Sequence, residues 1–169
     1  LSQALHAGRA YADAYAEAKR HAGAVDFDDL IARAVTLLLE DGMGDWIRYR
    51  LDQQTDHILV DEAQDTNTSQ WQIVGALAAE FFAGEGARGD GVRTIFTVGD
   101  FKQAIFGFQG TSPLAFEAAR RAFQVRAREA GHDFHDLSLD RSFRSTPAVL
   151  DVVDATLRLL APEGLGLPD

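Results

Sequence analysis

The sequence predicts an α/β fold in which a parallel sheet is flanked by helices. Two short apolar runs, 57–60 and 94–98, are bounded by polar residues and fit buried strands. Longer segments with apolar residues at helical spacing lie before, between and after these runs. The first run is followed directly by two acidic residues and the second by Gly99 and Asp100. Open parallel sheets bind ligands at the carboxyl ends of their strands.

The first third of the chain is expected to be helical. Residues 2–21 are rich in alanine and carry apolar side chains at helical spacing, and this helix should end near Gly23. Asp26 is suited to cap a second helix, because its carboxylate can accept hydrogen bonds from the free N–H groups of the first turn. A shorter helix is expected over residues 45–51.

The remainder of the chain alternates between helical and extended segments. A helix is predicted over residues 69–82, and the glycine-rich stretch 84–91 is predicted to be a loop that tolerates insertions. Pro113 can open a helix that runs to about Glu129. Residues 137–139 are a candidate third strand, and residues 147–160 are expected to form the last helix.

The composition bounds the possible functions. The chain has 169 residues, enough for one domain or for a domain plus part of another, and 46% of them are hydrophobic. It contains no cysteine, which excludes disulfides, thiolate zinc sites and cysteine nucleophiles and is compatible with a reducing cytoplasm, where we expect the protein. No apolar run approaches the ~18 residues of a membrane span, so no membrane partner is expected. The first residue is not methionine, which suggests a fragment.

The net charge of −10 argues against a freestanding DNA-binding domain. Phosphate contacts require lysine and arginine, and this chain has only two lysines, Lys19 and Lys102. A DNA groove in such a chain would therefore have to grip bases more than phosphates, with further cations supplied from elsewhere.

Carboxylates at the ends of both predicted strands suggest phosphoryl-transfer chemistry. Asp61 follows the first strand directly, where a rigidly held carboxylate can bind Mg²⁺ through its hydration shell. The neighbouring Glu62 points elsewhere and can polarise a water molecule. Asp100 follows the second strand and can either support the metal or cap the turn after it. An isolated Asp-Glu pair after a strand more often simply begins a turn, so the wider motifs have to decide.

Three ordered strings around these carboxylates resemble known helicase motifs. Residues 59–65 read LVDEAQD, residues 98–111 read VGDFKQAIFGFQGT, and residues 139–145 read LDRSFRS. They resemble motifs II, III and IV of superfamily 1 DNA helicases of the UvrD/Rep type. The DFDDL stretch at 26–30 resembles a short segment that precedes motif II in that family. The resemblance covers roughly residues 25–155.

The resemblance implies a partial RecA-like P-loop NTPase motor domain. Residues 1–25 would be a helix from an accessory subdomain, 26–133 the C-terminal part of the first motor domain, and 134–169 the start of the second. Neither lysine lies in a Gly-Lys-Ser/Thr context, so the Walker A loop is absent and the isolated chain should be inactive as an ATPase. The alternatives are a non-catalytic binding or scaffold domain, and a metal-dependent phosphoesterase that uses the three carboxylates.

The family assigns a role to each matching residue of the ATP site. Asp61 would hold Mg²⁺ and Glu62 would be the general base for the attacking water. Gln103 would sense the γ-phosphate of ATP and relay its state to the DNA groove. Arg144 would reach the γ-phosphate from the second motor domain, and Phe143 would stack on the adenine.

The same resemblance assigns the DNA contacts and the partners. Phe106 and Phe108 would meet the bases of single-stranded DNA, although aromatic residues at this spacing are more often part of a core. Gln109 would belong to the same DNA contacts, although most relatives have arginine at its position. The string 103–110 is closest to helicase–nuclease subunits of the AddA type. This branch implies a second subunit, single- and double-stranded DNA as partners, and a role in double-strand break repair.

Overall fold

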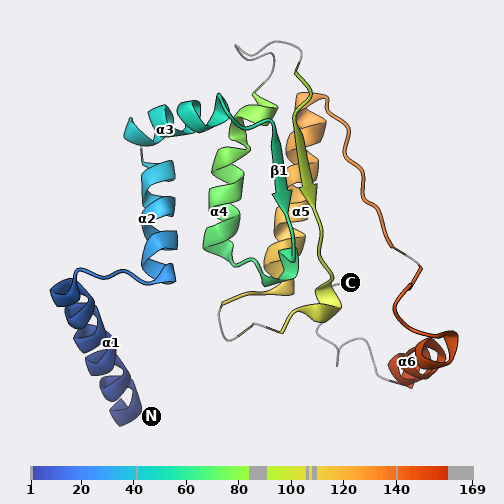
Figure 1. Ribbon diagram of the computed structural model, residues 1–169, viewed down its shortest axis with the longest axis horizontal. Coiled ribbons are helices and arrows are strands. Elements are labelled where there is room, and N and C mark those ends of the chain that lie inside the picture. The colour runs from blue at the N-terminus through green and yellow to red at the C-terminus, as the bar shows by residue number, and fades with distance from the viewer. Residues whose placement is uncertain are drawn as a thin grey trace.

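The computed structural model describes residues 2–40, 42–83, 91–105, 107, 110–139 and 141–159. Figure 1 shows α4 and α5 alongside the two strands, with α1 and α6 away from this central body. Two parallel strands with helices confirm the α/β class. The elements, in chain order, are α1 (Ser2–Ala22), α2 (Phe27–Leu39), α3 (Met43–Asp52), β1 (His57–Val60), η1 (Ala63–Asp65), α4 (Thr68–Leu77), η2 (Ala79–Phe82), β2 (Thr94–Thr97), η3 (Phe101–Gln103), α5 (Pro113–Ala130) and α6 (Pro147–Leu159), where η marks 3-10 turns.

Strands β1 and β2 pair in parallel, in a register that runs from His57 opposite Thr94 to Val60 opposite Thr97. Side chains alternate between exposed and half-buried along both strands. Leu59 is 69% exposed and Phe96 is 57% exposed, so the prediction of buried strands is wrong for one face of the sheet. Only the other face contributes to the hydrophobic core, in which residues of α4 and α5 pack.

The core lies beneath this covered face and consists mainly of aromatic rings. Trp71 of α4 and Phe116 of α5 stack with their ring centroids 6.1 Å apart and their planes 2° apart. Phe101 of η3 lies 4.6 Å from the Phe116 ring. Ala63, the first residue after the Asp61–Glu62 pair, is completely buried against the same rings. The core therefore lies directly under the carboxyl ends of the strands.

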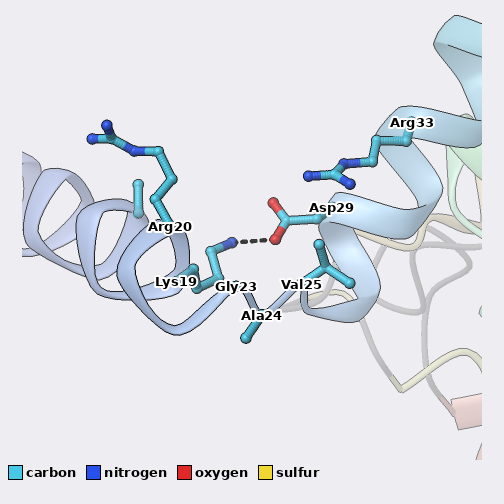
Figure 2. Close-up of a pocket in the computed structure, with 8 residues that line it drawn as sticks. Lys19, Arg20, Gly23, Ala24, Val25, Asp29 and Arg33 are labelled. Atoms are coloured by element: carbon cyan, nitrogen blue, oxygen red, sulfur yellow. Dashed lines mark hydrogen bonds and ion pairs between the residues drawn. The ribbon is translucent and has the colours of Figure 1, made fainter.

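The junction of α1 and α2 is held by a lysine between two carboxylates. Lys19 Nζ lies 2.8 Å from Asp26 Oδ2 and 2.6 Å from Asp29 Oδ2, and Figure 2 shows the second contact among the residues that line an open pocket. Asp26 and Asp29 also form the capping box of α2, which confirms the predicted cap. The Lys19 ammonium, followed by the Asp29 N–H, lowers the pKa of Asp26 to about 2. None of the residues of α1 is buried, so this junction is its main attachment.

Helix α5 is tied to the chain that follows it by a second ionic cluster. Glu117 accepts hydrogen bonds from Arg120 Nε at 2.7 Å and from Arg121 Nε at 2.5 Å. The Arg120 guanidinium, more than that of Arg121, lowers the pKa of Glu117 to about 2. Arg120 Nη1 also donates to Asp136 Oδ2 at 2.7 Å, which fixes the segment after α5.

Two further predictions differ from the structure. The helix expected over 69–82 is divided, because Ala78 has ψ of −7° and the chain tightens there into the 3-10 turn η2. Residues 137–139 form no strand. Leu137 is 80% exposed and Leu139 93% exposed, since no described strand runs beside them to pair with. Of the helices in the described ranges, none has both the length and the apolar composition that a membrane span requires.

Candidate functional site

The acidic residues after the two strands lie at one edge of the sheet. The parallel pairing continues past the strands, because the Val98 N–H donates to the Val60 oxygen at 2.8 Å and the Ala63 N–H donates to the Val98 oxygen at 2.9 Å. Asp61 and Glu62 therefore leave β1 beside the point where Asp100 follows β2. Figure 1 shows both strand arrows pointing to this same end of the central body.

Glu62 has a left-handed backbone, with φ of 49° and ψ of 46°. Among the described residues it is the one non-glycine residue with positive φ. A bulky residue in this conformation costs about 1–3 kcal/mol and persists only where its surroundings hold it, often at functional sites. Its N–H donates to Asp61 Oδ1 at 2.9 Å, whereas its own carboxylate accepts from Gln64, so the two adjacent carboxylates have different partners.

A buried glutamine connects the two strand ends. Gln64 is 1% exposed, and its Nε2 donates to Glu62 Oε2 at 2.7 Å. Its Oε1 accepts a hydrogen bond from the Asp100 N–H at 2.9 Å. This bridge was not assigned a role from the sequence, although Gln64 lies inside the LVDEAQD string. The sequence did carry a signal for it, because Gln64 is a polar residue in a tight turn directly after a predicted buried strand.

Gly99 allows this bridge to form. A Cβ on Gly99 would lie 2.9 Å from Gln64 Oε1, 2.9 Å from Phe116 Cε1 and 3.0 Å from Ala63 Cβ. Contacts under 3 Å do not occur between a real Cβ and its neighbours, so only glycine leaves room for the amide and the ring together. Close packing against Gln64 and Phe116 thus explains why residue 99, directly before Asp100, is glycine.

Asp100 caps the turn that follows β2. Its Oδ1 accepts from the Lys102 N–H at 2.9 Å and its Oδ2 accepts from Gln103 Nε2 at 2.9 Å. The predicted cap is therefore confirmed, and the role of Asp100 in supporting a metal stays a prediction. Glu62, Gln64, Asp100 and Gln103 form one continuous hydrogen-bonded chain, and its first and last residues are both exposed.

The candidate residues near the C-terminal end lie apart from this chain. Phe143 is 87% exposed and the Arg141 guanidinium lies 5.2 Å from its ring centroid. Arg144 is exposed as well, and within the described ranges no hydrogen bond, ion pair or ring contact joins either Phe143 or Arg144 to the strand ends. The candidate DNA contacts Phe106, Phe108 and Gln109 lie outside the described residues.

An open pocket of about 530 Å³ lies between the start of α2 and the start of α4. Two buried oxygens on its wall, Asp65 Oδ1 and Thr111 Oγ1, have no hydrogen-bond partner in the described part of the chain. Phe27 at its rim is 84% exposed. The pocket thus combines an exposed ring with unsatisfied polar atoms, and its lining residues are Phe27, Asp28, Ile31, Asp65, Asn67, Gln70 and Thr111.

No ready-made metal cage is present in the parts of the chain that the structure describes. They contain no group of three or more His, Cys, Asp or Glu side chains arranged to hold a metal ion. Mg²⁺ in nucleotide sites usually binds through one or two carboxylates, water molecules and the phosphates of the substrate. The exposed Asp61 carboxylate at the strand end fits that mode of binding.

Comparison with known proteins agrees with the motifs. Residues 3–124 match the family described as the UvrD/REP helicase N-terminal domain. The chain is 34% identical over 158 residues to the A subunit of the ATP-dependent helicase/nuclease of Exiguobacterium sibiricum, and the alignment covers 94% of this chain and 12% of that protein. The proteins of the same name from Bacillus pumilus and Syntrophomonas wolfei are 31% and 29% identical, and the alignments cover 92% and 94% of this chain.

The chain spans only 11–12% of the length of these three relatives. The match to the family, in contrast, covers most of the chain and includes both strands, the strand-end carboxylates and the Gln64 bridge. The chain therefore belongs to the UvrD/REP helicase N-terminal domain family and is similar to the helicase/nuclease A subunits within it.

Proposed function

We propose that this chain is the central part of an ATP-dependent DNA motor, in which ATP hydrolysis drives translocation along single-stranded DNA and unwinding of the duplex. The observation that carries the proposal is the hydrogen-bonded chain from Glu62 through Gln64 and Asp100 to Gln103. It joins a carboxylate suited to activate water to an exposed amide suited to contact a phosphate. Membership of the helicase family supports the same assignment.

The strand-end carboxylates divide the ATP chemistry between them. Asp61 would hold Mg²⁺, which offsets the negative charge of the phosphates, and its own Oδ1 is fixed by the Glu62 N–H. Glu62 would take a proton from the attacking water, because its exposed carboxylate is held in place by Gln64. Gln103 would report the presence of the γ-phosphate through Asp100 and Gln64.

The rest of the ATP site would come from the RecA-like parts of a longer protein. In this proposal residues 26–133 belong to the first motor domain and 1–25 to an accessory subdomain. Residues 134–169 begin the second motor domain, whose Phe143 and Arg144 would approach the adenine and the γ-phosphate when the domains close. The exposure of both side chains is compatible with such an approach.

Single-stranded DNA would cross the pocket beside α2 and α4. Phe27 offers an exposed ring for a base, and Asp65 and Thr111 offer polar atoms that lack partners. Stacking contributes ~1–3 kcal/mol per base and requires no cation, which suits a chain of net charge −10. Phe106 and Phe108 would also meet bases of the single strand.

The longer protein would work with a second subunit on broken DNA ends in the cytoplasm. This part of the proposal rests on the similarity to proteins named as the A subunits of helicase/nucleases, since a protein named as one of several subunits implies a complex.

The Glu62→Gln variant of the full-length protein tests the assignment of the general base. We expect DNA-stimulated ATPase turnover to fall by about 10²–10⁴-fold, because the amide cannot accept the proton of water, while nucleotide affinity stays near that of the wild type. Glu129→Gln serves as the matched control on the exposed end of α5. Unchanged turnover in Glu62→Gln would reject Glu62 as the base, and absence of turnover in the wild type would reject the motor.

The isolated chain is expected to show no DNA-stimulated ATP hydrolysis. Its sequence contains no glycine-rich loop ending in Gly-Lys-Ser/Thr, so the phosphates lack their main set of donors. A phosphate-release assay on residues 1–169 with and without single-stranded DNA checks this. Robust ATP hydrolysis by this polypeptide would contradict the proposal that part of the ATP site lies outside residues 1–169.

A further inference from the structure

Gln64 is the largest fully buried side chain among the described residues, and it is polar. A buried amide is costly unless its hydrogen-bonding groups are used, and Gln64 uses both ends. Its orientation is fixed by chemistry: the carboxylate of Glu62 only accepts, and the N–H of Asp100 only donates. If the amide nitrogen and oxygen were exchanged, two acceptors would face each other at Glu62 and two donors would face each other at Asp100.

The space between this amide and the end of β2 is tight. Ala63 is fully buried beside it, and Gly99 lies so close that one added methyl group would displace Oε1. The same methyl group would also lie 2.9 Å from Phe116 Cε1, so Gly99 is confined between the amide and the ring. Gln64 is therefore buried and held at both ends of its amide, by residues that follow β1 and β2.

We propose that Gln64 is a positioning residue, which holds the Glu62 carboxylate in place and transmits displacement of the β2 end to it. The inference rests on the proposed ATPase function. When Gln103 engages a phosphate, the pull on Asp100 reaches Glu62 through one rigid amide. When Gln103 loses its contact with the nucleotide, the Glu62 carboxylate returns to its starting position through the same hydrogen bonds. Gln64 itself is buried and does not touch the substrate.

Two substitutions separate the halves of the bridge. Gln64→Met fills the space but removes both hydrogen bonds. Gln64→Glu retains an acceptor for the Asp100 N–H and replaces the donor to Glu62 with a second carboxylate group. Gln72→Ala, on the exposed face of α4, is the matched control for loss of a glutamine.

The first measurement is steady-state ATPase activity of the full-length protein with saturating DNA. For Gln64→Met and Gln64→Glu we expect kcat to fall by about a hundredfold, the typical effect of displacing a catalytic group by 1 Å, with KM for ATP within about twofold of the wild type. Gln72→Ala should match the wild type. Gly99→Ala should reproduce the kcat loss, because its Cβ displaces the same amide oxygen.

The second measurement, hydrogen exchange followed by mass spectrometry on the nucleotide-free protein, needs no activity. Gln64→Met should speed exchange in the peptide containing the Asp100 amide, and Gln64→Glu should leave it protected. Peptides from α4 and α5 should be unchanged in both variants. A purely structural role would instead raise exchange across the whole central body.

The outcomes separate the two proposals. If the wild-type protein lacks DNA-stimulated turnover, the proposed function fails, while the exchange data still test the bridge. If the wild type turns over and Gln64→Met retains its kcat, or if exchange rises uniformly through the body, the positioning role is overturned.

Discussion

Replacing Phe116 with alanine tests whether the ring stack beneath the sheet stabilises the whole central body. Phe116 is 8% exposed, and its ring contacts Trp71 and Phe101 at centroid distances of 6.1 Å and 4.6 Å. The same ring supports Gly99 at the end of β2. Removing it should therefore weaken the contact between both helices and the strand ends.

The expected loss of unfolding free energy is about 3–5 kcal/mol, the range for truncating a buried phenylalanine. We expect the upper part of that range. Four of the eight buried apolar residues in the described ranges are alanines, so few large side chains can move into the cavity. Since domains are stable by about 5–15 kcal/mol, such a loss is a large fraction of the total.

Urea unfolding of residues 1–169 measures the loss. The chain has two tryptophans, and a Trp46→Phe background leaves the buried Trp71 as the only reporter of the core. Phe143→Ala, which truncates a ring that is 87% exposed, is the control and should change stability by less than about 0.5 kcal/mol. A Phe116→Ala loss below about 1 kcal/mol would refute the ring stack as the main source of stability.

Four further predictions concern caps and ion pairs. Asn67→Ala should lower the stability of α4 by about 1 kcal/mol, measurable by urea unfolding, because it removes the capping box; no change would contradict that role. Lys19→Met should speed proteolysis between α1 and α2, and an unchanged cleavage rate would show that the lysine is dispensable. The junction should also be pH-dependent: the pKa of Asp26 is lowered from 3.8 to about 2, so its contribution is complete above about pH 4 and lost as the pH falls towards 2. Glu117→Gln should remove a contribution with the same sign, present above about pH 4.5 and lost towards pH 2; acid unfolding curves that coincide with the wild type would disprove it.

The elements predicted best from the sequence were those with local signals. Asp26 and the Asp29 partner three residues later form the expected cap, and the two apolar runs pair as parallel strands. Such signals depend on hydrogen bonds within a few residues or on the period of apolar side chains, and both can be read along the chain.

The failures concern neighbours that are distant in sequence. Leu59 and Phe96 have the composition of buried residues, but only one face of their sheet is covered by the described helices. Leu139 resembles part of a strand, yet strand formation requires a partner that periodicity does not reveal. The Gln64 bridge joins residues 36 positions apart, and only the parallel register brings them together.

The attachment of α1 has a mechanical consequence. A straight helix of 21 residues is roughly 30 Å long, and here it is fixed at one end by Lys19 and followed by Gly23, whose φ is 60°. Any rotation of α1 relative to α2 would therefore be centred near the contact of Lys19 with Asp26 and Asp29. A rotation of about 10° at this contact would move the N-terminal end of α1 by roughly 5 Å. A small change at the start of α2 would thus produce a large displacement at the far end of α1.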